Sequence, residues 1–369
     1  MSDSPKPDAK AVTGDASVVD PDQIDTQRIV PVRYRSDEYP LLDTPLADHL
    51  GIEVPLICGP MYPCSNPDLV GAVSAAGGMG VLQPISLTYV HGHDFREGVR
   101  LIHRLAGGRP VGMNALIEKS SKLYHERMVQ WIDIALEEGV RFFVTSLGNP
   151  AWVVEKVHAV GGVVYHDVTE RKWAEKGAAG GVDGLIAVNN RAGGHAGQRT
   201  PAELLDEVAD LGLPVVCAGG IGTEQNFVEA LKLGYAGVQM GTRFIATEEC
   251  RAADAYKQAI LEADADDIVL SERITGVPVA VINTPYIEKM GLKAGPFARW
   301  MLRGRKRKHW MRTFYALKSI RQLKKASLDE EASREYWQAG KSADGVREIE
   351  PAGEIVQRFA GAAKGVASD

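Results

Sequence analysis

The sequence contains no apolar run close to the ~20 residues that a membrane-spanning helix needs, and its first residues lack the basic-then-apolar order of a secretory signal. It has only four cysteines, and none of them forms a Cys-x-x-Cys pair. These absences argue against a transmembrane segment, a disulfide scaffold and a bound metal, and they favour the cytoplasm. Cys58 and Cys217 lie in strand-like apolar runs, so we expect both to be small buried hydrophobes.

A regular alternation of short β-rich runs with longer amphipathic runs begins near Pro40. It contains eight strand candidates: Val54 to Cys58, Gly80 to Gln83, Val111 to Asn114, Phe142 to Thr145, Val163 to His166, Gly184 to Ala187, Pro214 to Ala218, and Gly237 to Met240. Asn66, Thr223 and Thr247 look like N-caps of the helices between or after them. Eight βα units predict a (β/α)8 TIM barrel rather than an open doubly wound sheet.

Charge is segregated in the last third of the chain. Residues 289 to 325 contain 13 Lys and Arg and no Asp or Glu, although the whole chain has a formal net charge of −6. Apolar side chains recur there at three- and four-residue steps, which predicts a basic amphipathic helical insertion; they are Trp310, Phe314, Leu317, Ile320 and Leu323. Such an insertion could pack on the barrel or across a homodimer, bind an anionic acyl-CoA or carrier protein, or meet an anionic membrane surface or partner.

These patterns divide the chain into four parts. Residues 1–35 are rich in Asp, Ser, Pro and Lys and are predicted to form a disordered tail. Residues 36–288 would form the barrel, residues 289–335 the basic helical insertion, and residues 336–369 a segment that returns to the barrel. No nucleic-acid-binding motif is present and the net charge is negative, so nucleic acid is not expected as a partner.

Three glycine-rich turns follow strands six, seven and eight. The last two, Gly219-Gly220-Ile221-Gly222 and Gly241-Thr242-Arg243, occupy the loops that form the usual phosphate site of such barrels. Glycine lets a phosphate approach backbone N–H donors, and the hydroxyl of Thr242 would add another donor. The alternative is that these glycines only close tight turns.

The first of the three turns contains His195. A neutral imidazole beside a phosphate-bearing cofactor could take a proton from a carbon acid near neutral pH. A polar loop residue is the alternative from spacing alone. His166 and Asp167 at the end of strand five could also face the cofactor, or could be ordinary strand-end residues.

Six segments together resemble the nitronate monooxygenase family, formerly the 2-nitropropane dioxygenases, and its relative, the flavin-dependent enoyl-[acyl-carrier-protein] reductase. They are Gly59-Pro60-Met61, Ala75 to Gly80, Gly112-Met113-Asn114, Ala192 to Gly197, Ala218 to Ile221, and Gly237 to Phe244. The resemblance covers residues 40 to about 285 and, weakly, Trp337 to Ser342.

The resemblance implies an FMN-binding TIM-barrel enzyme with His195 as its catalytic residue, and no metal. Asn114, Gly59 and Met61 would lie along the flavin. The other residues implied to hold FMN are Gly193, Gly194, Gly219, Gly220, Gln239, Met240, Gly241 and Thr242. The chain departs from the family in three places. Where the family commonly has Gln-Gly-x-Glu, this chain has Val188-Asn189-Asn190-Arg191; the loop from His195 to Cys217 is shorter than usual; and the late Ala-Gly-Gln of the family is Ala339-Gly340-Lys341.

Two reactions are compatible with this pattern. In the leading hypothesis, His195 is the base that presents a nitronate or nitroalkane to FMN, and O2 reoxidises the cofactor. In the alternative, NAD(P)H is the electron donor and the substrate is an acyl-CoA or acyl-carrier enoyl thioester, or a quinone. Arg191 and the basic insertion favour the alternative, because thioester carriers bring anionic phosphates.

Overall fold

The computed structural model describes residues 39–118, 122–273, 277–293, 323–329 and 336–366. Eight parallel strands pair in sequence order, and β8 returns to pair with β1, so the sheet closes into a barrel. The strands are β1 Leu56–Cys58, β2 Met79–Leu82, β3 Val111–Ile117, β4 Phe142–Leu147, β5 Val163–Val168, β6 Gly184–Val188, β7 Val215–Ala218 and β8 Gly237–Met240. The predicted TIM barrel and all eight predicted strands are confirmed.

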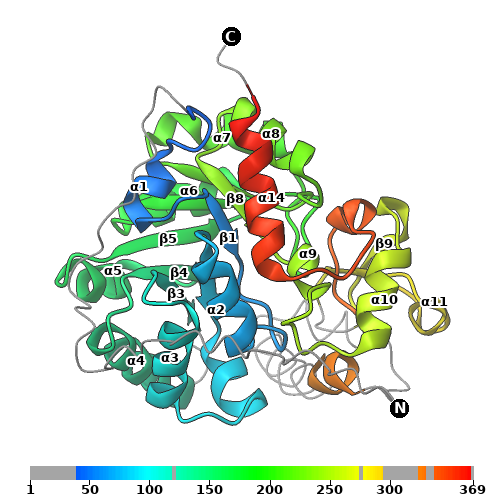
Figure 1. Cartoon of the computed structure of the whole chain (residues 1–369), viewed down its shortest axis with the longest axis horizontal. Helices are drawn as coiled ribbons and strands as arrows, with labels where there is room; N and C mark the ends of the chain where they lie inside the picture. The colour runs from blue at the N-terminus through cyan, green and yellow to red at the C-terminus, as the bar shows by residue number, and fades with distance from the viewer. Residues whose placement is uncertain (1–38, 119–121, 274–276, 294–322, 330–335, 367–369) are drawn as a thin grey trace, which may run out of the picture.

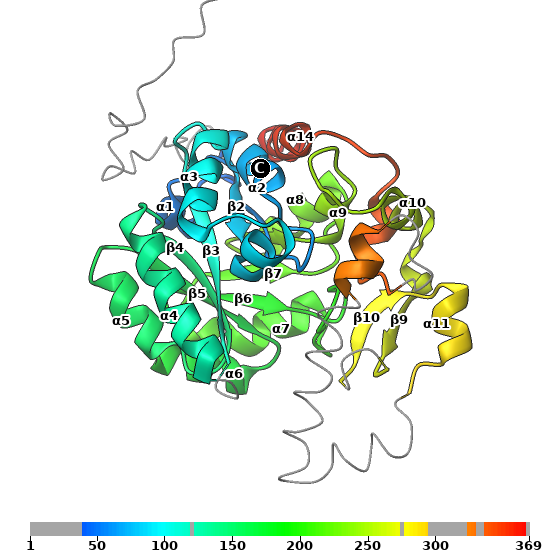
Figure 2. The ribbon, with the colours of Figure 1, turned by 90° about the horizontal axis from the view of Figure 1, so that it is seen from below.

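Helices surround the barrel as Figure 1 and Figure 2 show. They are α1 Pro45–Leu50, α2 Pro67–Ala75, α3 Phe95–Leu105, α4 Lys122–Glu137, α5 Ala151–His158, α6 Arg171–Ala179, α7 Pro201–Val208 and α8 Glu224–Leu233. Thr223 caps α8 with the expected side-chain bond to the backbone N–H of Asn226. No helix in the described parts of the chain is long and apolar enough to cross a bilayer.

The last helix, α14 Ala352–Lys364, takes the eighth place in the ring, between α8 and α2 (Figure 1). The rings of Phe227 on α8 and Phe359 on α14 lie 5.6 Å apart between centroids. At the other side, the Gln357 side chain donates to the carbonyl of Ala76. α14 therefore completes the ring of helices around the barrel.

Alternation along the strands separates two cores. Inside the barrel, residues of different strands pack together, among them Ile57, Met79, Val144, Tyr165, Ile186 and Val216. The residues between them face the helices in a larger outer core that includes Cys58 and Cys217, both about 1% exposed. The two thiols are thus buried hydrophobes, as expected.

Between β8 and α14 the chain makes a long excursion. It contains the short α9 Thr242–Ile245, then α10 Asp254–Glu262, an antiparallel pair of β9 Ile268–Ser271 and β10 Val279–Ile282, and α11 Pro285–Met290. Residues 323–328 are helical, and Leu323 and Ala326 pack with Val279 of β10. Most of the predicted basic insertion, residues 294–322, lies outside the described residues.

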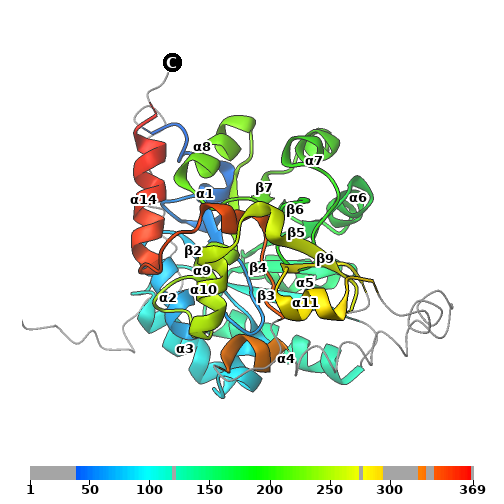
Figure 3. The same ribbon diagram turned by 90° about the vertical axis from the view of Figure 1, so that its right-hand side faces the viewer.

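The excursion lies over one end of the barrel (Figure 3). A backbone bridge between Gly194, after β6, and Ala280 of β10 fixes this end as the carboxyl end of the strands. The segment from Tyr336 onward runs back between these elements: the amide of Ile282 donates to the carbonyl of Trp337, and Tyr256 of α10 donates to the carbonyl of Gln338. The excursion therefore covers the face where barrel active sites lie.

Two of the predicted helix starts differ in detail. Asn66 precedes α2, but its amide donates to Asp68 and to the carbonyl of Glu249 instead of capping the helix. No helix starts at Thr247, so that prediction was wrong. Its hydroxyl donates to the carbonyl of Phe244, and the residue bridges to Glu350. The Asn66 side chain and the Thr247 backbone thus each contact a distant segment.

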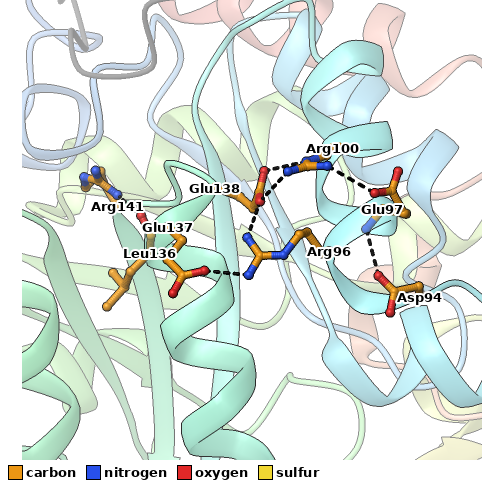
Figure 4. Close-up of polar contacts among 8 residues, drawn as sticks. All are labelled: Asp94, Arg96, Glu97, Arg100, Leu136, Glu137, Glu138 and Arg141. Carbon is orange, nitrogen blue, oxygen red and sulfur yellow. Dashed lines mark hydrogen bonds and ion pairs between the residues drawn. The ribbon is translucent and has the colours of Figure 1, made fainter. Parts of the chain in front are cut away.

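Ion pairs on the outer surface join neighbouring helices without shaping the site. Arg100 of α3 donates through Nε to Glu138 at 2.8 Å, and Arg96 contacts Glu137 and Glu138 after α4 (Figure 4). Exposed pairs of this kind contribute about 0–1 kcal/mol each. They connect neighbouring helices of the ring but contribute little to the free energy of unfolding.

Candidate active site

The glycine loop after β7 has a backbone that only glycine adopts readily. Gly219 has φ 118° and Gly220 has φ 85°, both in the region that L side chains rarely occupy. A Cβ on Gly219 would also lie 2.5 Å from the backbone N of Ala192. The sequence therefore places glycine here because the turn and its close neighbours require it.

The loop after β8 adds a hydroxyl next to that turn. Gly241 follows the strand, and Thr242, only 6% exposed, begins the four-residue α9. Its Oγ1 accepts a hydrogen bond of 2.9 Å from the amide of Gly340. The hydroxyl proton of Thr242 remains available to an acceptor in the mouth of the barrel. We call residues 219–222 and 241–243 the two glycine loops.

The segment Ala339 to Ser342 closes one side of the two glycine loops. The amide of Lys341 donates to the carbonyl of Arg191 at 2.8 Å. A Cβ on Gly222 would lie 2.3 Å from the carbonyl oxygen of Ser342, and one on Gly193 would lie 2.9 Å from the amide of Gly340. The weak similarity near the chain end thus belongs to the same place as the three glycine turns.

His195 lies on a loop whose backbone is hydrogen-bonded to the excursion between β8 and α14. The backbone amide of Ala280 donates to the carbonyl of Gly194 at 2.7 Å, and the backbone amide of Gly197 donates to the carbonyl of Asn189 at 3.1 Å. The His195 side chain is exposed to solvent, yet the surrounding protein partly desolvates it and lowers the pKa of its imidazole. The lowered pKa leaves the imidazole mainly neutral at pH 7.

Asn114, Asp167 and Gln239 line the inner wall at the carboxyl end of the barrel. The Tyr165 ring lies inside the barrel and His166 packs outward against Gly177 of α6, so alternation turns Asp167 inward. Burial raises the pKa of the Asp167 carboxyl to about 7. His166 accordingly faces away from the mouth, where burial lowers its pKa to about 4.

Two buried polar atoms on this wall have no hydrogen-bond partner: Asp167 Oδ1 and Gln239 Oε1. Leaving such an atom unpaired costs on the order of 1–3 kcal/mol. The Gln239 side chain lies against Gly59, where a Cβ would be 2.9 Å from its Cγ. Unpaired polar atoms at this end of the barrel are expected where a polar ligand completes the hydrogen bonding.

The structure brings most of the predicted site residues to this one mouth. Met61 lies beside the second glycine loop, because a Cβ on Gly241 would be 3.4 Å from its Sδ. Met240 differs: its side chain packs in the outer core, and its carbonyl accepts from the amide of Gly59. Any contact of Met240 with a ligand in the mouth would have to use its backbone.

A cavity of about 380 Å³ lies elsewhere, lined in part by Pro40, Thr44, Leu213, Pro214 and Tyr235. Pro214 and Ala236, which also lines it, precede β7 and β8, so this cavity is at the amino end of the strands. The polar residues of the mouth are at the opposite end. The cavity is therefore separate from the polar residues at the carboxyl end of the barrel.

The architecture defines a (β/α)8-barrel protein with a group of polar residues at the carboxyl ends of its strands. A family model described as nitronate monooxygenase matches residues 43–361. The chain belongs to the nitronate monooxygenase family, and it is an oxidoreductase of that family.

Three comparisons indicate the range of its relatives. The chain is 32% identical over 263 residues to the (3aS,4S,5R,7aS)-5-hydroxy-7a-methyl-1-oxo-octahydro-1H-indene-4-carboxyl-CoA dehydrogenase of Mycobacterium tuberculosis, covering 70% of this chain and 71% of that enzyme. It is 30% identical over 292 residues to a probable nitronate monooxygenase of Staphylococcus saprophyticus, covering 68% and 81%. The solved structure of FabK from Thermotoga maritima matches with a TM-score of 0.71 and 26% identity, covering 87% of this chain and 96% of that one.

Proposed function

We propose that the protein is an FMN-dependent oxidoreductase that exchanges a hydride between the flavin and a carbon atom of an acyl thioester. The observation that carries the proposal is a shared location: two glycine loops, His195 with its lowered pKa, and two buried polar atoms without a partner among the described residues all lie at the carboxyl end of the barrel strands. A phosphate-bearing cofactor with a polar ring system would satisfy each of these groups.

The residues at the carboxyl end of the barrel strands fit FMN. The amides of the loop around Gly220 and the Thr242 hydroxyl would hold the phosphate. Asn114 and Gln239 offer amide groups that can both donate and accept, as the ring carbonyls and ring N–H of a flavin require. When bound, FMN supplies the hydride acceptor or donor.

His195 has the properties of the base. Its lowered pKa keeps Nδ1 or Nε2 unprotonated at neutral pH, ready to take the proton α to a carbonyl group. The backbone bonds of its loop to Ala280 and Asn189 limit the freedom of the ring. We infer that this loop orients the imidazole toward a substrate bound over the cofactor.

The choice of a thioester rests on the relatives. A relative that is 32% identical acts, by its name, as a carboxyl-CoA dehydrogenase. Nitronate oxidation is the second candidate, since the family model and the staphylococcal relative carry that name.

Anaerobic titration of the flavin-loaded protein distinguishes these reactions. We expect purified protein to be yellow and to release FMN on denaturation. Flavin reduced in advance should be reoxidised by an enoyl-CoA, or oxidised flavin should be bleached by an acyl-CoA, with NADH and NADPH tested in parallel as donors. Bleaching by propionate 3-nitronate, with no response to any thioester, would establish the second candidate instead. Colourless protein that FMN cannot reconstitute would refute both.

A further inference from the structure

The side chain of Arg191 lies across the glycine turn after β7. A Cβ built on Gly220 would be 2.5 Å from Arg191 Nε, 2.8 Å from its Cδ and 3.1 Å from its Cβ. The arginine therefore runs along the backbone of Gly220 instead of extending into solvent. Burial raises the pKa of the Cys217 thiol on β7 to about 12, and the positive charge of Arg191 acts in the opposite direction on that pKa.

The backbone of Arg191 is fixed from two sides. Its amide donates to Asn189 Oδ1 at 2.8 Å, and its carbonyl accepts from the amide of Lys341 at 2.8 Å. Asn189 is itself fully buried and donates to the carbonyl of Gly219, so the same side chain ties Arg191 to the glycine turn. The position of the arginine relative to the turn is thus built into the fold.

The charge of Arg191 is not compensated by any carboxylate in the described residues. Two neighbouring arginines do have partners: Arg243, in the loop after β8, pairs with Glu350, and Arg199, just beyond the first glycine turn, pairs with Glu207 at 2.8 Å. The three glycine turns, residues 190–197, 219–222 and 241–243, contain no Asp or Glu. A partly buried guanidinium without a counter-ion, lying on a turn of backbone amides, is suited to bind an anion.

We propose that Arg191 binds the phosphate monoester of the cofactor, together with the amides of the loop after β7. This inference rests on the proposed FMN dependence, and it adds a residue that the family pattern does not provide, because an acid is common at this position. A guanidinium presents a planar pair of N–H donors that matches two phosphate oxygens, whereas a lysine ammonium acts as a point charge. The consequence is a strong preference for FMN over riboflavin, which has the same ring and no phosphate.

Binding of FMN and riboflavin to the flavin-free protein, measured by quenching of flavin fluorescence, tests the assignment. We expect Arg191→Gln to raise the Kd of FMN roughly 10- to 100-fold, the range for losing a hydrogen bond to a charged group, and to leave the Kd of riboflavin within about twofold. Arg191→Lys should fall between wild type and Arg191→Gln. Arg199→Gln, which removes an exposed arginine from the same loop, should leave both constants unchanged.

Each contrary result has a distinct meaning. An unchanged FMN constant in Arg191→Gln, or equal weakening of FMN and riboflavin, would overturn the assignment, the latter by showing a merely structural role. Loss of CoA binding with FMN affinity intact would assign the arginine to a substrate phosphate and would also overturn it. Wild-type protein that binds neither flavin would end the proposed function; flavin bound equally by wild type and variant would end this inference alone.

Discussion

Thr242 and Gly340 are joined by a hydrogen bond of 2.9 Å, in which the amide of Gly340 donates to the hydroxyl oxygen of Thr242. The two residues are 98 positions apart, and the bond connects the loop after the last barrel strand to the segment that returns from the excursion. Since Thr242 is 6% exposed, water has little access to replace the bond. The second glycine loop and the C-terminal segment therefore form one unit.

Replacing Thr242 with valine should remove the hydrogen bond to Gly340 while keeping a side chain of the same shape. The variant leaves a buried N–H without an acceptor, which costs about 1–3 kcal/mol in the free energy of unfolding. Urea unfolding of the flavin-free protein measures this loss. Thr242→Ser, which keeps the oxygen and loses a methyl group, is the matched control, and equal stability of the valine and serine variants would contradict the role of the bond.

Gly220→Ala tests whether the turn that needs glycine for its backbone conformation also binds the cofactor. Its Cβ would be forced into Arg191 at a backbone φ of 85°, so we expect both a loss of about 1–2 kcal/mol in stability and weaker FMN binding. Gly212 is the control: it has φ 68°, and a Cβ added there would meet nothing within 4 Å. Gly212→Ala should lose similar stability and keep its FMN affinity, as measured by fluorescence quenching. FMN bound equally well by both variants would contradict the placement of the phosphate.

The barrel could be predicted from the sequence because its signals are local. Each strand is a short apolar run followed by a polar or glycine turn, and all eight runs form strands at the predicted positions. β3 and β4 extend further than predicted, to Ile117 and Leu147, because they continue to pair with each other beyond the rim. The β9–β10 pair was not predicted, although both strands are apolar runs, since they follow the break in the βα rhythm.

The site could be predicted only in part, because its remaining features depend on distant contacts. The glycine turns and His195 carry their own local pattern. The inward direction of Asp167 depends on the register of β5, and the outward direction of Met240 on that of β8. The packing of Ala339 to Ser342 on the glycine loops joins residues more than 90 positions apart, and no local pattern encodes that contact.

His195→Asn should retain flavin and lose turnover. Removing a general base typically costs 10²- to 10⁴-fold, and we expect roughly 10²-fold or more with a neutral substrate that must lose a proton. Because desolvation lowers the pKa of His195 below 6.5, the midpoint of the fall in wild-type turnover on acidification should lie below pH 6.5. Stopped-flow measurement of flavin reduction gives the rate. Normal rates in a variant with its full flavin content would end the assignment of His195 as the base.

Asp167→Asn should change how stability depends on pH in the flavin-free protein. Burial raises the pKa of this carboxyl from 3.8 to about 7, so between these values the folded state holds a proton that the unfolded chain has released. The favourable contribution is complete below pH 3.8 and is lost as the pH rises toward 7, by at most about 4 kcal/mol at 1.36 kcal/mol per pH unit. The variant should therefore gain stability relative to wild type as the pH increases from 4 to 8, as measured by urea unfolding. Asp210→Asn is the control: hydrogen bonding to Arg171 lowers the pKa of Asp210 from 3.8, so its contribution is lost only at more acidic pH and its difference from wild type should stay nearly constant from pH 4 to 8. A difference between Asp167→Asn and wild type that does not vary with pH would show that the carboxyl is already ionised inside the barrel.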